Sequence, residues 1–263
     1  ALALRGVDLF LVSRRSHPVA APLRLFPGAR ADALGGAGLV ILAVPDDAIT
    51  SVAADLAGEH SVRPDHAVLH LSGLLDRRAL SPLAETGAAL GSFHPLQTIA
   101  DPVAAPERLL GAYAGLEGDE RAIEVGGDLA RELGMVPVPL SAGGKAAYHA
   151  GAAIVANYTT ALFAVAERLA HEAGIPPETA ARLYLPLLRG TAANLDSGPV
   201  AALTGPVRRG DVQTIRAHLA VLSGAEARLY RLLGEEALHL ARQAGLAAEL
   251  ADQVAQVLRE RGE

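Results

Sequence analysis

The sequence predicts an α/β domain followed by an all-helical domain. Short apolar segments alternate with helical segments up to about residue 140, a pattern typical of a parallel sheet covered on both faces. From Ser141 onward, no segment has the character of a strand. We therefore expect an α/β domain over residues 1–140 and a helical domain over residues 141–263.

Six segments of the first half have the composition of buried strands, and most of them stop in turn-forming residues. They are 7–15, 37–49, 66–73, 87–95, 113–119 and 135–141. Helical stretches separate several of these strands, for example residues 48–60. Residues 121–134 form the clearest amphipathic helix, which ends at Gly134.

The second half divides into helical segments separated by Gly and Pro. We expect helices over 144–173, 177–195, 199–206, 211–223, 225–244 and 246–261. The stretch GIPPETA (174–180) places Gly after one helix, Pro in the first turn of the next and Glu178 near its N-terminus. This arrangement is a stop signal followed by a start signal.

Composition excludes several classes of function. The net charge of −6 and the pI near 5.9 give no basic surface for nucleic acid. The absence of cysteine excludes disulfides, zinc–thiolate sites and cysteine nucleophiles, and it fits a cytoplasmic protein. No metal site is predicted. The uncharged run 146–166 is long enough to suggest a membrane span, but its polar residues favour a buried core helix, so no membrane partner is expected.

Lys145 is the single lysine beside 22 arginines. A lysine pKa shifts readily on burial, whereas arginine stays charged. His149 follows one helical turn later and shares the same helix face. Carbonyl reduction needs a proton donor and a group that stabilises the developing negative charge, and either residue suits either role. Chance retention of the lysine and a packing role for the histidine are the alternatives.

Three successive predicted strands end in small or polar residues. The ends of parallel strands meet at one edge of a sheet, where ligands bind. Ordinary turn chemistry is the alternative, but three such ends favour a shared crevice. The residues that we expect to line it are Val44, Pro45, Asp46, Ser72, Gly73 and His94.

The first predicted strand ends in four residues suited to a phosphate: Ser13, Arg14, Arg15 and Ser16. In a dinucleotide-binding fold this position meets the adenosine ribose, where arginines and serines fit the 2′-phosphate of NADP. A solvated basic turn is the alternative. A glycine-rich phosphate-binding turn should precede this strand, and we expect it to lie ahead of residue 1.

The helical half carries four further candidates for substrate binding. Asn157 and Asn194 are the only asparagines, and a polar residue in an apolar helix needs a partner. Arg208 and Arg209 lie in a break between helices and could hold a substrate carboxylate. The alternatives are a structural hydrogen bond for Asn157 and, for the arginines, a solvated helix start capped by Asp211.

Four motifs together carry a resemblance to a known family. VILAVPDDAI, GSFHPLQT, GGKAAYHAGAAIVANY and LTGPVRRGD resemble a bacterial family with a Rossmann-like domain and a C-terminal domain of unknown function. That family is similar to the 6-phosphogluconate-dehydrogenase-like reductases. The resemblance implies a Rossmann-like doubly wound parallel sheet that binds NADP, an all-helical dimerisation domain after it, and a site between the two.

The same resemblance suggests an activity. Lys145 matches the catalytic lysine of β-hydroxyacid dehydrogenases and ketopantoate reductases, while His149 stands where those families have asparagine. It implies a homodimeric, NADP-dependent oxidoreductase that reduces a small 2-oxo acid, with 2-dehydropantoate as the specific expectation. Reduction of an imine, as in pyrroline-carboxylate reductases, and a non-catalytic NADP-binding sensor are the alternatives.

Overall fold

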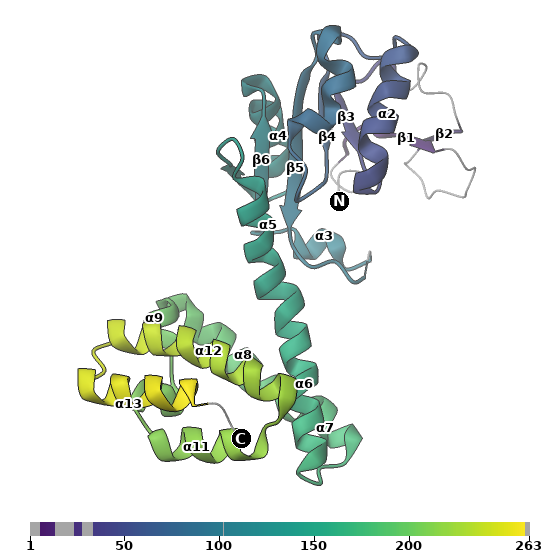
Figure 1. The fold of residues 1–263 in the computed structure, drawn as a ribbon. Coiled ribbons are helices and arrows are strands. Elements are labelled where there is room, and N and C mark those ends of the chain that lie inside the picture. The colour runs from purple at the N-terminus through teal and green to yellow at the C-terminus, as the bar shows by residue number, and fades with distance from the viewer. Residues whose placement is uncertain (1–5, 14–23, 28–33, 102, 261–263) are drawn as a thin grey trace. The chain divides into compact units, whose positions relative to one another are not determined.

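The computed structural model describes residues 6–13, 24–27, 34–101 and 103–260, which form two compact units. The first unit is Ala1–Tyr158 and the second is Thr159–Glu263. The expected α/β class with a helical C-terminal region is confirmed (Figure 1). The division falls after Tyr158, so the first turns of the long helix belong to the α/β unit.

The α/β unit contains a five-stranded sheet with the order β3-β4-β5-β6-β7. Its strands are β3 (Leu39–Leu42), β4 (Ala67–His70), β5 (Ala89–Leu96), β6 (Tyr113–Gly118) and β7 (Val136–Pro139). Strands β3, β4 and β5 run parallel, as do β6 and β7. The pair β5–β6 is antiparallel, so the sheet is parallel, as expected, except at this one junction, which was not predicted.

The antiparallel junction has a local cause in the chain. Between β5 and β6, the residues that the structure describes form only the short helix α3 (Ala105–Arg108) and no helix of full length. A parallel return requires a crossover of a dozen or more residues, usually as a helix on one face. After the segment between β5 and β6, the chain enters β6 in the direction opposite to β5.

Both faces of the sheet are covered, because alternate strand residues point to opposite sides. Val68 packs in a cluster with α2 (Asp46–Gly58) and the 3₁₀ segment η2 (Arg77–Thr86), while its neighbour Leu69 packs in a cluster with α4 (Glu120–Glu132). The sheet is therefore wound on both sides, as expected. The 3₁₀ segment was not predicted.

A second, two-stranded sheet pairs β1 (Phe10–Ser13) with β2 (Arg24–Pro27) in parallel. Strand β1 lies within the predicted segment 7–15, whereas β2 was not predicted.

A long helical run follows strand β7. It consists of α5 (Lys145–Ala153), a π-helical turn (Ile154–Tyr158) and α6 (Thr159–Glu172). This run matches the helix predicted over 144–173. Short π-helical insertions distort a helix locally and often lie near functional sites.

The second unit is entirely helical within its described residues. After α6 come α7 (Pro177–Leu183), α8 (Leu185–Asn194), the 3₁₀ turn η4 (Leu195–Ser197), α9 (Pro199–Ala202), α10 (Gly205–Arg209), α11 (Val212–Val221), α12 (Gly224–Gln243) and α13 (Ala248–Arg259). Its core joins α11, α12 and α13 through Ile215, Leu238 and Val254, which are at most 3% exposed. Helix α8 contributes no buried residue.

Candidate active site

Lys145 is buried at the start of α5 and is only 2% exposed. Its Nζ donates hydrogen bonds to the backbone oxygen of Ser72, at 2.6 Å, and to Oγ of Ser92, at 2.8 Å. Ser72 follows β4 and Ser92 lies within the neighbouring parallel strand β5. The ammonium group is therefore fixed against two adjacent strands by two uncharged acceptors, and no carboxylate contacts it directly among the described residues.

Burial changes the acid–base behaviour of this lysine. Desolvation lowers the pKa of Lys145 from its ordinary 10.5 to about 8, and the negative charges of Glu117, Asp46 and Asp76 work against that shift. Glu117 is itself buried, at 8% exposed. The result is a lysine that exchanges its proton close to neutral pH, which arginine cannot do.

Ser72 acts as a structural connector at the end of β4. Its hydroxyl donates to Oδ2 of Asp46 at 2.7 Å and accepts from the backbone N–H groups of Leu74 and Leu75 at 3.2 and 2.9 Å. These contacts orient the Ser72 carbonyl that receives Lys145. Asp46 is the first residue of α2, and the positive N-terminal end of the helix dipole stabilises its carboxylate.

His70 supports the same turn from inside the protein. It is fully buried, its Nδ1 accepts from the Ser72 backbone N–H at 3.3 Å, and its Nε2 lies 3.2 Å from the Asp76 carbonyl, to which it donates. Burial lowers the pKa of His70, so the ring stays neutral and keeps this one tautomer. His70 is therefore a positioning residue behind Ser72.

Three aromatic polar side chains gather beside Lys145. Tyr148 and His149 follow it on α5, and His94 comes from β5. Oη of Tyr148 lies 3.1 Å from Nδ1 of His94, and the His94 ring meets each of the other two rings edge to face with centroids 5.6 Å apart. We call His94, Tyr148 and His149 the aromatic cluster.

Two glycines make room for this cluster. A Cβ atom on Gly73 would lie 2.4 Å from Nδ1 of His149 and 2.8 Å from Nε2 of His94. A Cβ atom on Gly115 would lie 2.8 Å from Oη of Tyr148. Real side chains do not make contacts this short, so any larger residue at either glycine would displace the cluster.

Several predicted site residues thus lie together within the α/β unit. Lys145, His149, Ser72, Gly73 and His94 belong to one set of contacts. Asp46 joins this set through Ser72, and Val44 and Pro45 precede it at the end of β3.

The other predicted residues are placed differently. Ser13 ends β1, whereas Arg14, Arg15 and Ser16 lie outside the described residues. Asn157, in the π-helical turn, and Asn194, at the end of α8, are both exposed.

Arg208 and Arg209 lie on α10 in the helical unit. Arg208 donates to the carbonyl of Ala244 at 3.0 Å, and Arg209 is exposed. Asp211 caps the following helix through the backbone N–H of Thr214, as the structural alternative predicted.

The sequence interpretation missed Tyr148, Ser92 and Glu117. Tyr148 stands three residues after Lys145 and shares its helix face by the same spacing rule that selected His149. Ser92 lies in the quoted stretch GSFHPLQT, and Glu117 lies inside the predicted strand 113–119. Spacing could have found Tyr148, but only the register of β4 and β5 places Ser92 beside the lysine.

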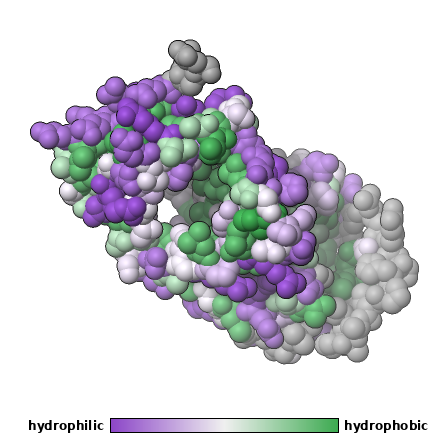
Figure 2. Space-filling view, turned by 90° about the horizontal axis from the view of Figure 1, so that it is seen from below, coloured by the Kyte–Doolittle hydropathy of each residue, from purple (hydrophilic) through white to green (hydrophobic). Residues whose placement is uncertain are grey.

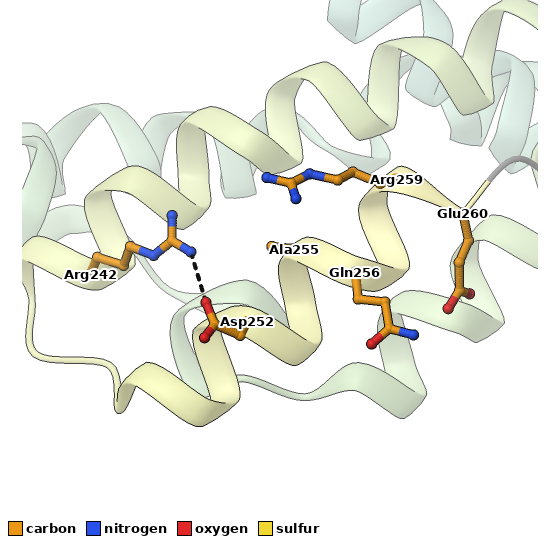
Figure 3. Close-up of a pocket in the computed structure, with 6 residues that line it drawn as sticks. All are labelled: Arg242, Asp252, Ala255, Gln256, Arg259 and Glu260. Carbon is orange, nitrogen blue, oxygen red and sulfur yellow. Dashed lines mark hydrogen bonds and ion pairs between the residues drawn. The ribbon is translucent and has the colours of Figure 1, made fainter.

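Two surface hollows lie outside the aromatic cluster. One of about 340 Å³ in the α/β unit is lined by Asp76, Arg77, Arg78, Glu117, Ala142 and Gly143. The other, about 480 Å³, lies between α12 and α13 and is lined by Arg242, Asp252, Ala255, Gln256, Arg259 and Glu260 (Figure 3). Its charged residues are mostly exposed, and Arg242 pairs with Asp252 at 3.5 Å, so we assign it no site.

Family models match both parts of the chain. A Rossmann-like domain matches residues 24–95, and a domain of unknown function, DUF2520, matches residues 112–237. The solved structure of protein TM1727 from Thermotoga maritima is 30% identical, with 78% of each chain covered and a TM-score of 0.61. The chain belongs to the family in which a Rossmann-like domain precedes a DUF2520 domain.

More distant structures share the fold. A Bacteroides fragilis protein provisionally described as an NADP oxidoreductase is 20% identical, with 91% of each chain covered and a TM-score of 0.68. Pyrroline carboxylate reductase from Plasmodium falciparum, solved with NADP bound, is 13% identical over 97% of this chain and 92% of its own, with a TM-score of 0.56. A search of functionally curated proteins gives no match.

Proposed function

We propose that this protein is an NADP-dependent reductase of a small carbonyl compound, and that Lys145 and the aromatic cluster form its active site. The observation that carries the proposal is the burial of the single lysine at the ends of two parallel strands, beside a tyrosine and two histidines. In open α/β sheets this edge is where ligands bind. The similarity in fold to NADP oxidoreductases supports the same conclusion.

The residues at the strand ends suit the nicotinamide part of such a cofactor. Ala43 and Pro45 are exposed and Val44 is half-buried at the end of β3, so they offer an uncharged surface. Asp46 and Asp47 open α2, and their carboxylates disfavour a phosphate there. When bound, the cofactor supplies a hydride. The residues that would hold its 2′-phosphate are Ser13, Arg14, Arg15 and Ser16.

Lys145 contributes a positive charge behind the reacting group. A buried ammonium acts in a medium of low effective dielectric, where it stabilises a developing oxyanion more strongly than in water. Two of its three N–H groups are already occupied by Ser72 and Ser92, which fixes its position before the substrate arrives. A preorganised charge of this kind favours the transition state over the ground state.

The first substrate to test is 2-dehydropantoate, as a representative of small 2-oxo acids. A cyclic imine is the second candidate, favoured by the fold similarity to pyrroline carboxylate reductase. Turnover of the two compounds with NADPH, measured by the loss of nicotinamide absorbance, separates them. Tight cofactor binding without turnover of any carbonyl or imine would favour a non-catalytic sensor instead.

We expect the protein to bind NADPH at least roughly tenfold more tightly than NADH, the effect of one charge-assisted hydrogen bond to the 2′-phosphate. The basis is the sequence Ser13-Arg14-Arg15-Ser16, which carries no acid at this strand end. Calorimetric titration of the full-length protein with both cofactors measures the ratio. Arg14→Ala combined with Arg15→Ala should lower affinity for NADPH while leaving that for NADH unchanged. Equal affinities in the unmodified protein would contradict the assignment.

We expect kcat/KM for carbonyl reduction to fall as pH rises through about 8, the pKa of Lys145. Below this pH the lysine is charged and supports catalysis, and above it the charged fraction drops tenfold per pH unit. A pH profile from 6 to 10, with NADPH affinity measured alongside, tests this. A flat profile up to pH 10 with unchanged cofactor affinity would show that the charge of Lys145 is not needed.

We also propose a homodimer in which a second copy covers the apolar surface of the helical run. Ile154, Val155 and Tyr158, all in the π-helical turn of this run, are 59%, 74% and 60% exposed. Figure 2 shows hydrophobic residues, in green, at the surface among hydrophilic ones, in purple. Exposed apolar surface of this extent marks an interaction site.

A membrane is the other environment that could cover this run. Within the described residues, one helix, Lys145–Glu172, is long and apolar enough to cross a bilayer, and none of its apolar window is buried. However, its first turn is fixed against the sheet through Lys145, and Glu167 and Arg168 interrupt its other end. The uncharged stretch between them could cross a bilayer only if this first turn left the sheet, which favours a protein partner.

A further inference from the structure

Three polar side chains form a row across the buried sheet. In the register of the strands, Ser92 of β5 is paired with His70 of β4 on one side and with Glu117 of β6 on the other. Paired residues of neighbouring strands lie on the same face of a sheet. All three are buried, on the face where Val68 packs with α2 and η2. A buried polar row of this kind needs partners, and the partners of this one include Lys145.

Lys145 joins the row at its middle member. Its Nζ donates to Oγ of Ser92 at 2.8 Å, so Glu117 flanks the hydroxyl that holds the ammonium group. Directly paired residues of an antiparallel sheet have Cβ atoms roughly 4.5–5.5 Å apart. The carboxylate of Glu117 and the ammonium group of Lys145 therefore lie on one face, on either side of a single hydroxyl. At such a range an opposite charge favours the charged form of a lysine.

A single peptide group holds Glu117 in this row. The carbonyl of Asp76 accepts from Nε2 of His70 at 3.2 Å, and the N–H of Arg77, in the same peptide group, donates to Oε2 of Glu117 at 2.8 Å. The side chain of Arg77 pairs instead with Asp119, at 2.8 Å. Glu117 thus receives a hydrogen bond that stabilises a carboxylate, but within the described residues it forms no ion pair.

Two other acids act on Lys145, and each has a partner of its own. Oδ2 of Asp46 accepts from Oγ of Ser72 at 2.7 Å, and Asp76 pairs with Arg78 at 2.6 Å. Burial lowers the pKa of Lys145, and the charge that opposes this shift most is that of Glu117. The geometry of the row and the electrostatics therefore select the same acid.

The remaining titratable groups gathered around Lys145 are His70, His94, Tyr148 and His149. Burial lowers the pKa of His70 and that of His94, and it raises the pKa of Tyr148. These three side chains are therefore uncharged near neutral pH and supply no counter-charge.

We infer that Glu117 is the counter-charge of Lys145, a positioning residue that keeps the ammonium group charged at the pH at which the reductase works. This inference rests on the proposed function. Because Ser92 rather than Glu117 accepts from Nζ, the carboxylate supports the charge without occupying the third N–H group of the lysine. That group stays available to an oxyanion. Without Glu117 the buried ammonium group would lose its proton at a lower pH.

The first test follows the protonation of Lys145 without any turnover. Lys145 is the only lysine of the sequence, so NMR of protein labelled with ¹³C in lysine reports its titration, and Lys145→Met identifies the signal. We expect a midpoint at about pH 8 in the unmodified protein. Glu117→Gln keeps an acceptor for Arg77 but removes the charge, so it should lower the midpoint by at least roughly one pH unit. Glu124→Gln, at an exposed acid of α4 on the other face of the sheet, should leave it unchanged.

A second variant, Glu117→Asp, separates the charge from the shape of the side chain. It keeps the carboxylate, so the midpoint should stay within about half a pH unit of the unmodified value. A purely structural role predicts the reverse order, with Gln silent and the shorter Asp disruptive. An unshifted midpoint in folded Glu117→Gln, or a shift of a full pH unit in Glu117→Asp, would overturn the inference.

The third measurement is kcat/KM for 2-dehydropantoate between pH 6 and 10. In Glu117→Gln the value should be roughly tenfold below normal at pH 9 but little changed at pH 6, because only the proton of Lys145 is held less tightly. An equal loss at every pH would overturn the inference. A shifted NMR midpoint in a protein that reduces neither this carbonyl nor 1-pyrroline would refute the proposed function and leave Glu117 as the counter-charge.

Discussion

Lys145→Met is expected to lower kcat/KM for carbonyl reduction by at least roughly a hundredfold while leaving NADPH binding intact. Methionine has the length of the lysine side chain without its terminal nitrogen, so it fills the same apolar path and brings no charge. The loss should appear in kcat, because the ammonium is fixed by Ser72 and Ser92 before the substrate binds. Steady-state kinetics and a cofactor titration on the same preparation measure both quantities.

The fold should tolerate this change. Removing a buried charge relieves its desolvation cost, while Ser72 O and Ser92 Oγ each lose a donor, and the two effects oppose each other. We expect the free energy of unfolding to change by no more than about 2 kcal/mol. Lys145→Arg is the less informative variant, because a larger guanidinium group in place of a side chain that is only 2% exposed is expected to strain the packing. A methionine variant with near-normal turnover would show that the catalytic charge lies elsewhere.

The same pair of proteins tests the lowered pKa of Lys145 independently of activity. An unfolded lysine keeps its proton up to about pH 10.4, whereas Lys145 in the folded protein releases it near 8. Between these values the unfolded state binds more protons, so stability should rise with pH. Thermal melts from pH 7.5 to 10 should show this rise in the unmodified protein and not in Lys145→Met. Parallel curves for the two proteins would contradict the assigned pKa.

The spacing of apolar residues predicted most of the helices and strands, because local composition determines most of these elements. The strand around Ala67–His70 is apolar on both faces, and the helix over Glu120–Glu132 has one apolar side. The antiparallel β5–β6 pair was missed because strand direction depends on how the intervening segment returns, and a list of apolar segments does not contain that information. Strand β2 was missed because its four residues, RLFP, are too few to show alternation.

The candidate site was predictable where its residues are close in sequence. Lys145 and His149 share a helix face by spacing alone. The contacts that give them their chemistry come from elsewhere: Ser92 from β5, and Gly73 from the turn after β4. A glycine that makes room for two histidine rings looks like any turn glycine in sequence. Its role depends on the parallel register of β4 and β5, which only the folded chain defines.

The proposed homodimer leads to the second large expected effect, for Val155→Glu. Val155 is 74% exposed in the π-helical turn, and helix α8 has no buried residue at all, so both need a partner surface. Placing a carboxylate in an apolar interface without a partner charge is costly, and we expect the dimer to dissociate at least roughly a hundredfold more readily. Sedimentation velocity over a range of concentrations measures this change.

The matched control for this variant is Val103→Glu, because Val103 is 86% exposed but lies between β5 and β6, away from the helical run in sequence. The side-chain exchange is identical, so the net charge and the solubility change equally. Only the change at Val155 should shift the sedimentation coefficient toward that of a monomer. If the unmodified protein already sediments as a monomer at micromolar concentration, the dimer is refuted. Recovery of that monomer with phospholipid vesicles would assign the apolar run to a membrane surface instead, because a helix that no second copy covers still needs an apolar environment.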